Sequence, residues 1–301
     1  MRHVDQRREF SANVAIVSHV RFARYVAIGD SQTEGLWDGD DAAGLVGYAD
    51  RLAAMLDSLH PGLMYANLAV RGRQVRDVLT DQLPQALAMN PDLITVCVGM
   101  NDVTQPGRSF ERALADLEEL YAALARSQAT VVTTKFPNIG RILPAGRLLA
   151  PRIRRINAVI GSAANRHGFG LVDLYRAPAM EKLDTWSPDF IHASTKGHIL
   201  FAAAAAEALG LPGSNHDWAL AGGDETRPSV SARTQAQLRW TTNMLMPWLW
   251  DLLRGRSSGD GRSPKRPRLA SVGSAGPQGN NAGSEHALRL GQRLRAPDGH
   301  P

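Results

Sequence analysis

The sequence predicts an α/β fold: a three-layer α/β/α sandwich with a five-stranded parallel sheet between two layers of helices. Two observations lead to this prediction. Five short apolar runs, rich in β-branched and aromatic residues, alternate with longer segments whose apolar residues recur at helical spacing. Strands that alternate with helices are joined most simply by parallel crossovers, and such crossovers place helices on both faces of one sheet.

The predicted strands are short, and each ends at a turn. The first stops at Gly29, and the third is apolar throughout, as is typical of a central parallel strand with both faces buried. The five strands are predicted over residues 25–28, 63–70, 92–98, 130–134 and 170–175. The helices are predicted over residues 48–59, 75–87, 109–127, 152–167 and 195–209.

The chain divides by composition into a long globular part and shorter flanking segments. Its 301 residues, 44% of them hydrophobic, are enough for one large domain with a full core. We expect this domain over residues 24–213, after an N-terminal extension of residues 1–23. A linker over 214–230, an amphipathic segment over 231–254 and a disordered basic tail over 255–301 are expected to follow.

The net charge of +5 belongs to the end of the chain. From Arg254 onward there are nine Lys and Arg against three Asp and Glu. The body is therefore close to neutral, and nothing in it predicts a nucleic-acid partner. The single cysteine, Cys97, excludes an internal disulfide. No signal peptide and no apolar run near the ~20 residues of a membrane span is found, so a cytoplasmic protein is expected.

Residues 238–253 form an apolar stretch with three tryptophans, interrupted by Pro247 and followed by the basic tail. A helix that packs on its own domain or on a partner subunit has this pattern. A peripheral membrane contact also has it, because tryptophans favour the lipid interface and basic residues attract anionic lipid. Both interpretations stay open from the sequence.

A turn follows each of the first three predicted strands. Ser31 follows the first strand, Gly72 the second and Asn101 the third. Because the carboxyl ends of parallel strands share one edge of a sheet, we expect these three residues to converge there. Each residue taken alone is typical of an ordinary turn or helix cap.

A second cluster lies late in the chain, in Ser187-Pro-Asp-Phe-Ile-His192. An Asp and a His three residues apart on a loop can approach each other, which leaves the other imidazole nitrogen free to act as a base. The alternatives are a structural histidine or a metal-dependent hydrolase, for which Asp30, Asp189, His192 and His198 are the candidate ligands. A non-catalytic α/β binding module is a third alternative.

Together these motifs resemble the SGNH hydrolases, also called GDSL-type lipases and acylhydrolases. The resemblance spans about residues 25–209, with each motif weak alone and the four in order specific. Its four blocks are Gly29-Asp-Ser-Gln-Thr-Glu-Gly35, Gly72, Gly99-Met-Asn-Asp102 and Asp189-Phe-Ile-His192. The sequence departs from the family at Gln32, where an apolar residue is common.

The resemblance implies a flavodoxin-like sheet and the hydrolysis of a small-molecule or lipid-like ester, more rarely a thioester or amide. It implies Ser31 as nucleophile, His192 as its base, and Asp189 as the residue that orients the base. For the oxyanion hole it implies the backbone N–H groups of Ser31 and Gly72 and the side-chain amide of Asn101. No cofactor or metal is expected. The loops over 36–46 and 136–151 are expected to set the acyl-chain length.

Overall fold

The computed structural model describes residues 21–273 except 43, 105–108, 143, 221–258 and 260. The apolar stretch 238–253, and with it the expected membrane or subunit contact, therefore lies outside the described residues. So do residues 1–20 and 274–301. None of the helices described is long and apolar enough to cross a membrane.

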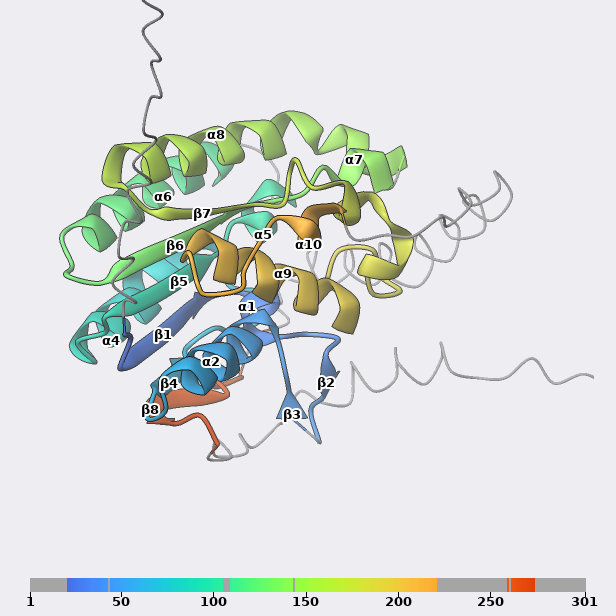
Figure 1. Ribbon diagram of the computed structural model, residues 1–301. Coiled ribbons are helices and arrows are strands. Elements are labelled where there is room, and N and C mark those ends of the chain that lie inside the picture. Colours follow the sequence, from blue (N-terminus) through green and yellow to red (C-terminus); the bar gives the residue numbers. More distant parts are fainter. Residues whose placement is uncertain are drawn as a thin grey trace, which may run out of the picture.

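The main sheet has the strand order β7-β6-β5-β1-β4-β8 and lies between two layers of helices (Figure 1). The first five of these strands are mutually parallel, which confirms the predicted fold class. The strands are β1 (Arg24–Gly29), β4 (Met64–Asn67), β5 (Leu93–Cys97), β6 (Thr130–Lys135), β7 (Gly170–Asp173) and β8 (Arg266–Ser271). A small hairpin is formed by β2 (Gly39–Asp40) and β3 (Gly44–Leu45).

The helices pack in two groups. α2 (Tyr48–Leu59) and α9 (Thr195–Ala208) contact each other on one face of the sheet, and α6 (Ser109–Ala125) and α8 (Ala150–His167) contact each other on the other (Figure 1). The shorter helices are α1 (Ser31–Glu34), α3 (Val75–Asp77), α4 (Leu83–Ala88), α5 (Met100–Thr104), α7 (Ile139–Ile142) and α10 (Asp217–Leu220). Single turns are η1 (Val78–Gln82), η2 (Pro144–Leu148), η3 (Pro178–Glu181) and η4 (Leu183–Thr185).

The centre of the core is the first strand and its neighbours. Residues 25–28 of β1 are completely buried, so this strand has protein on both faces and both edges. The Tyr25 ring stacks on Tyr65 of β4, and its hydroxyl is 2.7 Å from the Thr95 hydroxyl of β5. Side-chain contacts thus hold the three strands in register together with the backbone hydrogen bonds between them. The carboxyl ends of these strands meet at one edge of the sheet.

The prediction of five strands is wrong by one, because residues 266–271 form a sixth strand, β8, antiparallel to β4. The prediction that residues 255–301 are disordered is accordingly wrong for this segment. Its sequence, with three charged or polar residues and Pro267, is typical of a tail. An edge strand tolerates such residues because one of its sides faces no partner strand. Pairing with β4 and the contact of the Arg266 guanidinium with the Tyr65 ring stabilise it instead.

The predicted boundary at residue 213 is also too early. Residues 217–220 form α10, which packs on α9, and Trp218 is buried in this contact. The beginning of the expected linker over 214–230 therefore belongs to the domain. The predicted helix over 75–87 is divided in the structure by the π-helical turn η1, which has a direct consequence for the site described next.

Candidate active site

Ser31 is the first residue of α1 and lies immediately after β1. The carboxylate of Asp30 accepts a hydrogen bond from the Gln32 N–H and so caps the helix. Gly29 precedes it with a positive φ of 148°, and a Cβ there would lie 2.2 Å from the Cys97 carbonyl oxygen. Only glycine fits this turn, which brings Ser31 out of the strand and turns it into the helix.

Gln82 fixes the backbone of this turn from a different element. Its side-chain amide accepts from the Gly29 N–H at 2.8 Å and donates to the Gly29 carbonyl at 2.9 Å. The side chain is buried, and it projects from the π-helical turn η1. A π-turn inserts one extra residue into a helix and redirects the side chain there, and such turns are frequent at functional sites.

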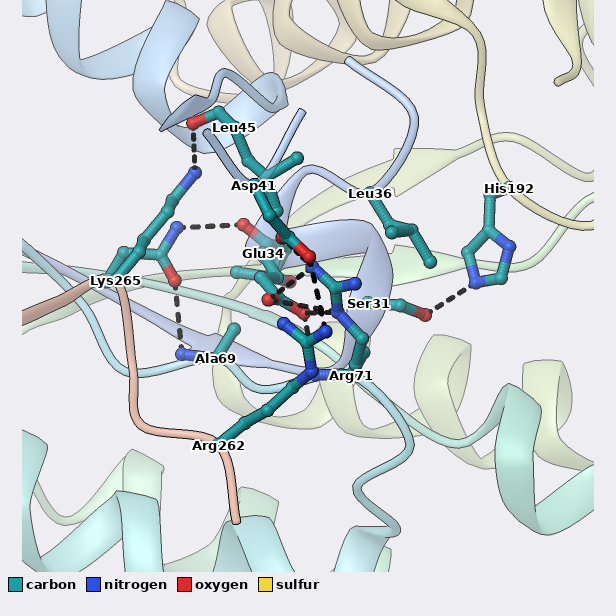
Figure 2. Close-up of polar contacts among 12 residues, drawn as sticks. Ser31, Glu34, Leu36, Asp41, Leu45, Ala69, Arg71, His192, Arg262 and Lys265 are labelled. Atoms are coloured by element: carbon teal, nitrogen blue, oxygen red, sulfur yellow. Dashed lines mark hydrogen bonds and ion pairs between the residues drawn. The ribbon is translucent and has the colours of Figure 1, made fainter. Parts of the chain in front are cut away.

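His192 lies on the loop before α9, and its ring bridges two predicted site residues. Its Nε2 is 2.8 Å from the Ser31 Oγ, a contact visible in Figure 2, and its Nδ1 is 2.6 Å from Asp189 Oδ2. The three residues predicted from the sequence as a catalytic group are therefore brought together in a continuous chain of hydrogen bonds.

Asp189 is a fully buried carboxylate that is satisfied by four further donors. Its Oδ1 accepts from the Ser187 hydroxyl at 2.7 Å and from the N–H groups of Ile191 and His192 at 2.8 and 2.9 Å. The Trp37 indole donates to its Oδ2 at 2.8 Å. Burial alone raises the pKa of this carboxyl, but the charge and hydrogen bonds of His192 outweigh it and lower the pKa to about 2.

The pKa of His192 is raised above its ordinary value of 6.5. Burial disfavours the charged imidazolium and lowers the pKa, but the charge and hydrogen bond of Asp189 raise it by more. Asp30 raises it further, while Arg71 lowers it. The raised pKa of His192 thus reflects a neighbouring carboxylate, Asp189, that stays ionised.

Gln32 holds the loop of His192 against α1. Its amide donates to the Ile191 carbonyl at 2.8 Å and accepts from the Ala193 N–H at 3.3 Å, so it binds the backbone on both sides of His192. The departure from the family pattern at this position therefore places a polar clamp between the serine helix and the histidine loop.

Asn101 is the second residue of α5, the helix that follows β5, and it links the other two strand ends. Its side-chain amide donates to the Arg73 carbonyl at 2.8 Å and lies 3.5 Å from the Asp30 carboxylate. Gly72, next to Arg73, has a positive φ of 78°. The loop that carries Gly72, the turn before Ser31 and the start of α5 are therefore in mutual contact, as the strand-end argument predicts.

An ion pair that the sequence did not indicate joins α1 to the Gly72 loop. The Arg71 guanidinium binds both carboxylate oxygens of Glu34, and the Arg71 N–H donates to the same carboxylate at 2.8 Å (Figure 2). Both side chains are almost completely buried. The Asp41 carboxylate also binds Arg71, at 3.0 Å.

The alternative metal-ligand set is not brought together. His198 contacts the Tyr48 N–H and the Leu36 carbonyl through its two ring nitrogens, and burial lowers its pKa to about 4. Among the residues described, no group of three or more His, Cys, Asp and Glu side chains has an arrangement that could hold a metal. His198 is thus a structural histidine that fixes the loop after α1.

Of two hollows on the domain, one adjoins the site. An apolar cavity adjoins Gln32 and Ile191 and is lined by side chains of Met100, Phe136, Trp186 and Phe201 among others. A wider groove lies between α2, α9 and residues 211–218, and no residue of the Ser31–His192–Asp189 chain lines it. The first is therefore the hollow relevant to the site, since residues next to both Ser31 and His192 form its wall.

Comparison with known proteins identifies the family. The model of the GDSL-like lipase/acylhydrolase family matches residues 27–200, which is more than half of the chain. The chain belongs to this family. No curated protein matches the GDSL-like chain at a significant level.

Solved structures resemble this GDSL-like acylhydrolase in fold. One is LAE5, an α/β hydrolase enzyme from the metagenome of Lake Arreo, with 26% identity, a TM-score of 0.52, and coverage of 62% of this chain and 95% of that one. Another is a catalytic mutant of an acetylxylan esterase from Geobacillus stearothermophilus, with 19% identity, a TM-score of 0.53, and coverage of 64% and 97%. The resemblance inferred from the four motifs is confirmed.

The clamp of Gln82 on Gly29 gives a prediction for the GDSL-like domain. Gln82→Leu keeps the size of the side chain but leaves a buried N–H and C=O without their partner, which costs ~1–3 kcal/mol. We expect a lower midpoint of urea unfolding and a lower kcat for an activated ester. The matched control is Gln85→Leu, three residues on and exposed. Wild-type stability and turnover in Gln82→Leu would contradict the role of the clamp.

Proposed function

We propose that this chain is a serine esterase that cleaves carboxylic esters through an acyl-enzyme on Ser31. The observation that carries the proposal is the unbroken relay from the Ser31 Oγ through His192 to Asp189, with contacts of 2.8 and 2.6 Å. A serine hydroxyl is a weak nucleophile until a base removes its proton, and the His192 Nε2 is within hydrogen-bond reach of that proton. The family membership supports an ester as the bond that is cleaved.

In the proposed reaction, the His192 Nε2 takes the proton of Ser31 as the Oγ attacks the ester carbonyl carbon. The imidazolium that forms is stabilised by Asp189, whose lowered pKa keeps the carboxylate ionised throughout. The tetrahedral intermediate collapses when the leaving alkoxide receives the proton from His192 and departs as the alcohol. Water then repeats the sequence on the acyl-enzyme and releases the carboxylic acid.

The oxyanion formed in both steps needs fixed donors. We assign this role to the N–H groups of Ser31 and Gly72 and to the amide of Asn101, because the three strand ends that carry them are in mutual contact. The bond from Asn101 to the Arg73 carbonyl ties the side-chain donor to the Gly72 loop, so the two are positioned together.

The cavity beside Gln32 and Ile191 has an apolar lining and a volume of only about 20 Å³, so it supports a small apolar group as the part of the substrate that enters it. Its walls include Phe136, Pro137 and Ile139 from the loop over 136–151, one of the two regions expected to set acyl-chain length. Ile191 and Ala193, on either side of His192, also line it. Hydrolysis of a small-molecule or lipid-like ester without metal or organic cofactor is thus the proposed activity.

The nucleophile is testable by covalent labelling. A fluorophosphonate probe is expected to form one adduct, on Ser31, because this hydroxyl is the one paired with a histidine base. Ser31→Ala should abolish labelling and lower kcat by ~10⁶, the loss typical when a triad serine is removed. Ser58→Ala, an exposed serine on α2, is the control and should label normally. Peptide mapping that places the adduct elsewhere, or a fully active Ser31→Ala protein, would refute the proposal.

Removal of the Asn101 amide should weaken stabilisation of the transition state. The loss of one oxyanion donor typically costs ~10²–10³ in kcat, so Asn101→Ala should turn over slowly with little change in KM. Asn165→Ala, on the exposed side of α8, is the matched control. If folded Asn101→Ala protein turns over at the wild-type rate, Asn101 is not an oxyanion donor.

The pH profile follows from the raised pKa of His192. The ring must be neutral to accept a proton, so activity is present above its pKa and lost as the pH falls through it. The rising limb of kcat/KM should therefore lie above pH 6.5. In Asp189→Asn the carboxylate charge is gone and burial remains, so the limb should move to lower pH. A limb that does not move belongs to another group, such as Asp30, whose pKa burial raises to about 7.

A further inference from the structure

Residues 259–271, apart from 260, form an arm that begins beside the proposed oxyanion hole and ends as strand β8. We call these residues the C-terminal arm. They lie beyond the match to the family model, which ends at residue 200. The arm is therefore an addition to the family domain, yet it touches the loop that carries Gly72.

The first contact is between backbones. Gly259 is buried against residues 70 and 71, and a Cβ placed on it would lie 2.2 Å from the Arg71 carbonyl oxygen and 3.3 Å from the Val70 Cγ1. The Arg71 carbonyl belongs to the peptide bond whose N–H is that of Gly72. Any side chain at 259 must therefore displace either the arm or the peptide plane that presents the proposed oxyanion donor.

The second contact is ionic and passes through one shared carboxylate. The Arg262 Nη2 is 3.2 Å from one oxygen of Asp41, whose other oxygen is 3.0 Å from the Arg71 Nη2. The Arg262 side chain is only 7% exposed, so water screens this pair weakly. Figure 2 draws the guanidinium groups of Arg262 and Arg71 close to Asp41 and Glu34, with Ser31 on the other side of Arg71.

The arm is anchored beyond these contacts. Lys265 donates to the Leu45 carbonyl at 3.0 Å and pairs with Asp50 on α2. Residues 266–271 then pair with β4, the strand whose carboxyl end leads into the Gly72 loop. Gly259 precedes Arg262, and Lys265 and strand β8 follow it, so the arm is held on both sides of the Arg262–Asp41 pair.

We propose that the C-terminal arm positions the oxyanion-hole loop: Gly259 supports the Arg71–Gly72 peptide from behind, and Arg262 holds Arg71 through Asp41. Gly259 and Arg262 are positioning residues, because the contacts described above join them to Arg71, Val70 and Asp41 and so act on the site through other residues. The inference rests on the proposed esterase function, because it assigns the Gly72 N–H to the oxyanion. The position of the hydrogen-bond donors in the oxyanion hole matters, because a displacement of about 1 Å can lower the rate ~10²-fold.

The experiment compares a Gly→Ala change in the arm with one just beyond it. Gly259→Ala should lower kcat for a p-nitrophenyl ester by ~10–10² while KM changes little, because substrate binding is kept and oxyanion stabilisation is weakened. Gly273→Ala is the matched control, since a Cβ there meets nothing within 4 Å. Wild-type kcat in folded Gly259→Ala would overturn the proposal.

Three arginine variants test the proposal if Gly259→Ala does not fold. Arg262→Gln removes the charge that shares Asp41 and should lower kcat several-fold, and Arg262→Lys should restore part of it. Arg268→Gln removes the same charge from an exposed position of the arm and should leave kcat unchanged. Equal kcat in Arg262→Gln and Arg268→Gln would overturn the proposal.

Further measurements distinguish a positioning role of the arm from a loss of folded protein and from failure of the esterase assignment. The rising limb of the pH profile should stay in place in Gly259→Ala and Arg262→Gln, since His192 and Asp189 are untouched. A merely unstable variant would instead lose active protein, which titration with a fluorophosphonate counts directly. If Ser31→Ala retains wild-type hydrolysis, the esterase assignment fails first, whereas Ser31-dependent activity that ignores the arm refutes only the arm proposal.

Discussion

The buried charge of Asp189 constrains the site more than any other single feature. A carboxylate without access to water needs donors for both oxygens, and here they come from a serine, an indole, two backbone N–H groups and the His192 ring. Because three of these donors come from Ser187, Ile191 and His192, the hydrogen bonds of Asp189 fix the conformation of the loop over 187–192. Phe190, the next residue in the sequence, has a positive φ of 55°, and Trp37, whose indole binds this carboxylate, has a positive φ of 73°. Such conformations cost energy for large side chains, and the hydrogen bonds of Asp189 compensate for it.

Neutral amides perform most of the remaining alignment. Gln82 holds the strand residue before the serine, Gln32 holds the histidine loop, and Asn101 holds the Gly72 loop, each by bonds to backbone atoms. Amides do not titrate, so the alignment of the loops does not vary with pH while the charge on His192 does. The ion pair between Glu34 and Arg71 is a charged tie, but it is buried and multidentate, which is the arrangement in which an ion pair is strong enough to fix a geometry.

The sequence predicted the parts of the site that follow from where strands end. Ser31, Asn101 and Gly72 were expected at one sheet edge because the carboxyl ends of parallel strands share that edge, and the contacts among their loops agree with this. The contact of His192 with Asp189 was expected from their spacing, and its contact with Ser31 only from the family resemblance. Trp37 and Gln82 escaped prediction because their partners lie far away in sequence and an isolated Trp or Gln carries no signal. The strand over 266–271 was missed because disorder was predicted from composition. Composition does not show whether the sheet has an unpaired edge, here that of β4, to which a polar segment can pair.

Strand β8 also has a consequence for how the chain folds. Met64 of β4 pairs with Ser271, so this edge of the sheet is completed by residues that leave the ribosome long after the other described strands have been synthesised. Until then β4 exposes an unpaired row of N–H and C=O groups, the kind of edge on which two nascent chains can join. Contacts between segments so distant in the chain form slowly, because a large loop must close first. Completion of the sheet is thus set by the last part of the chain, and a prematurely terminated product would retain an adhesive edge.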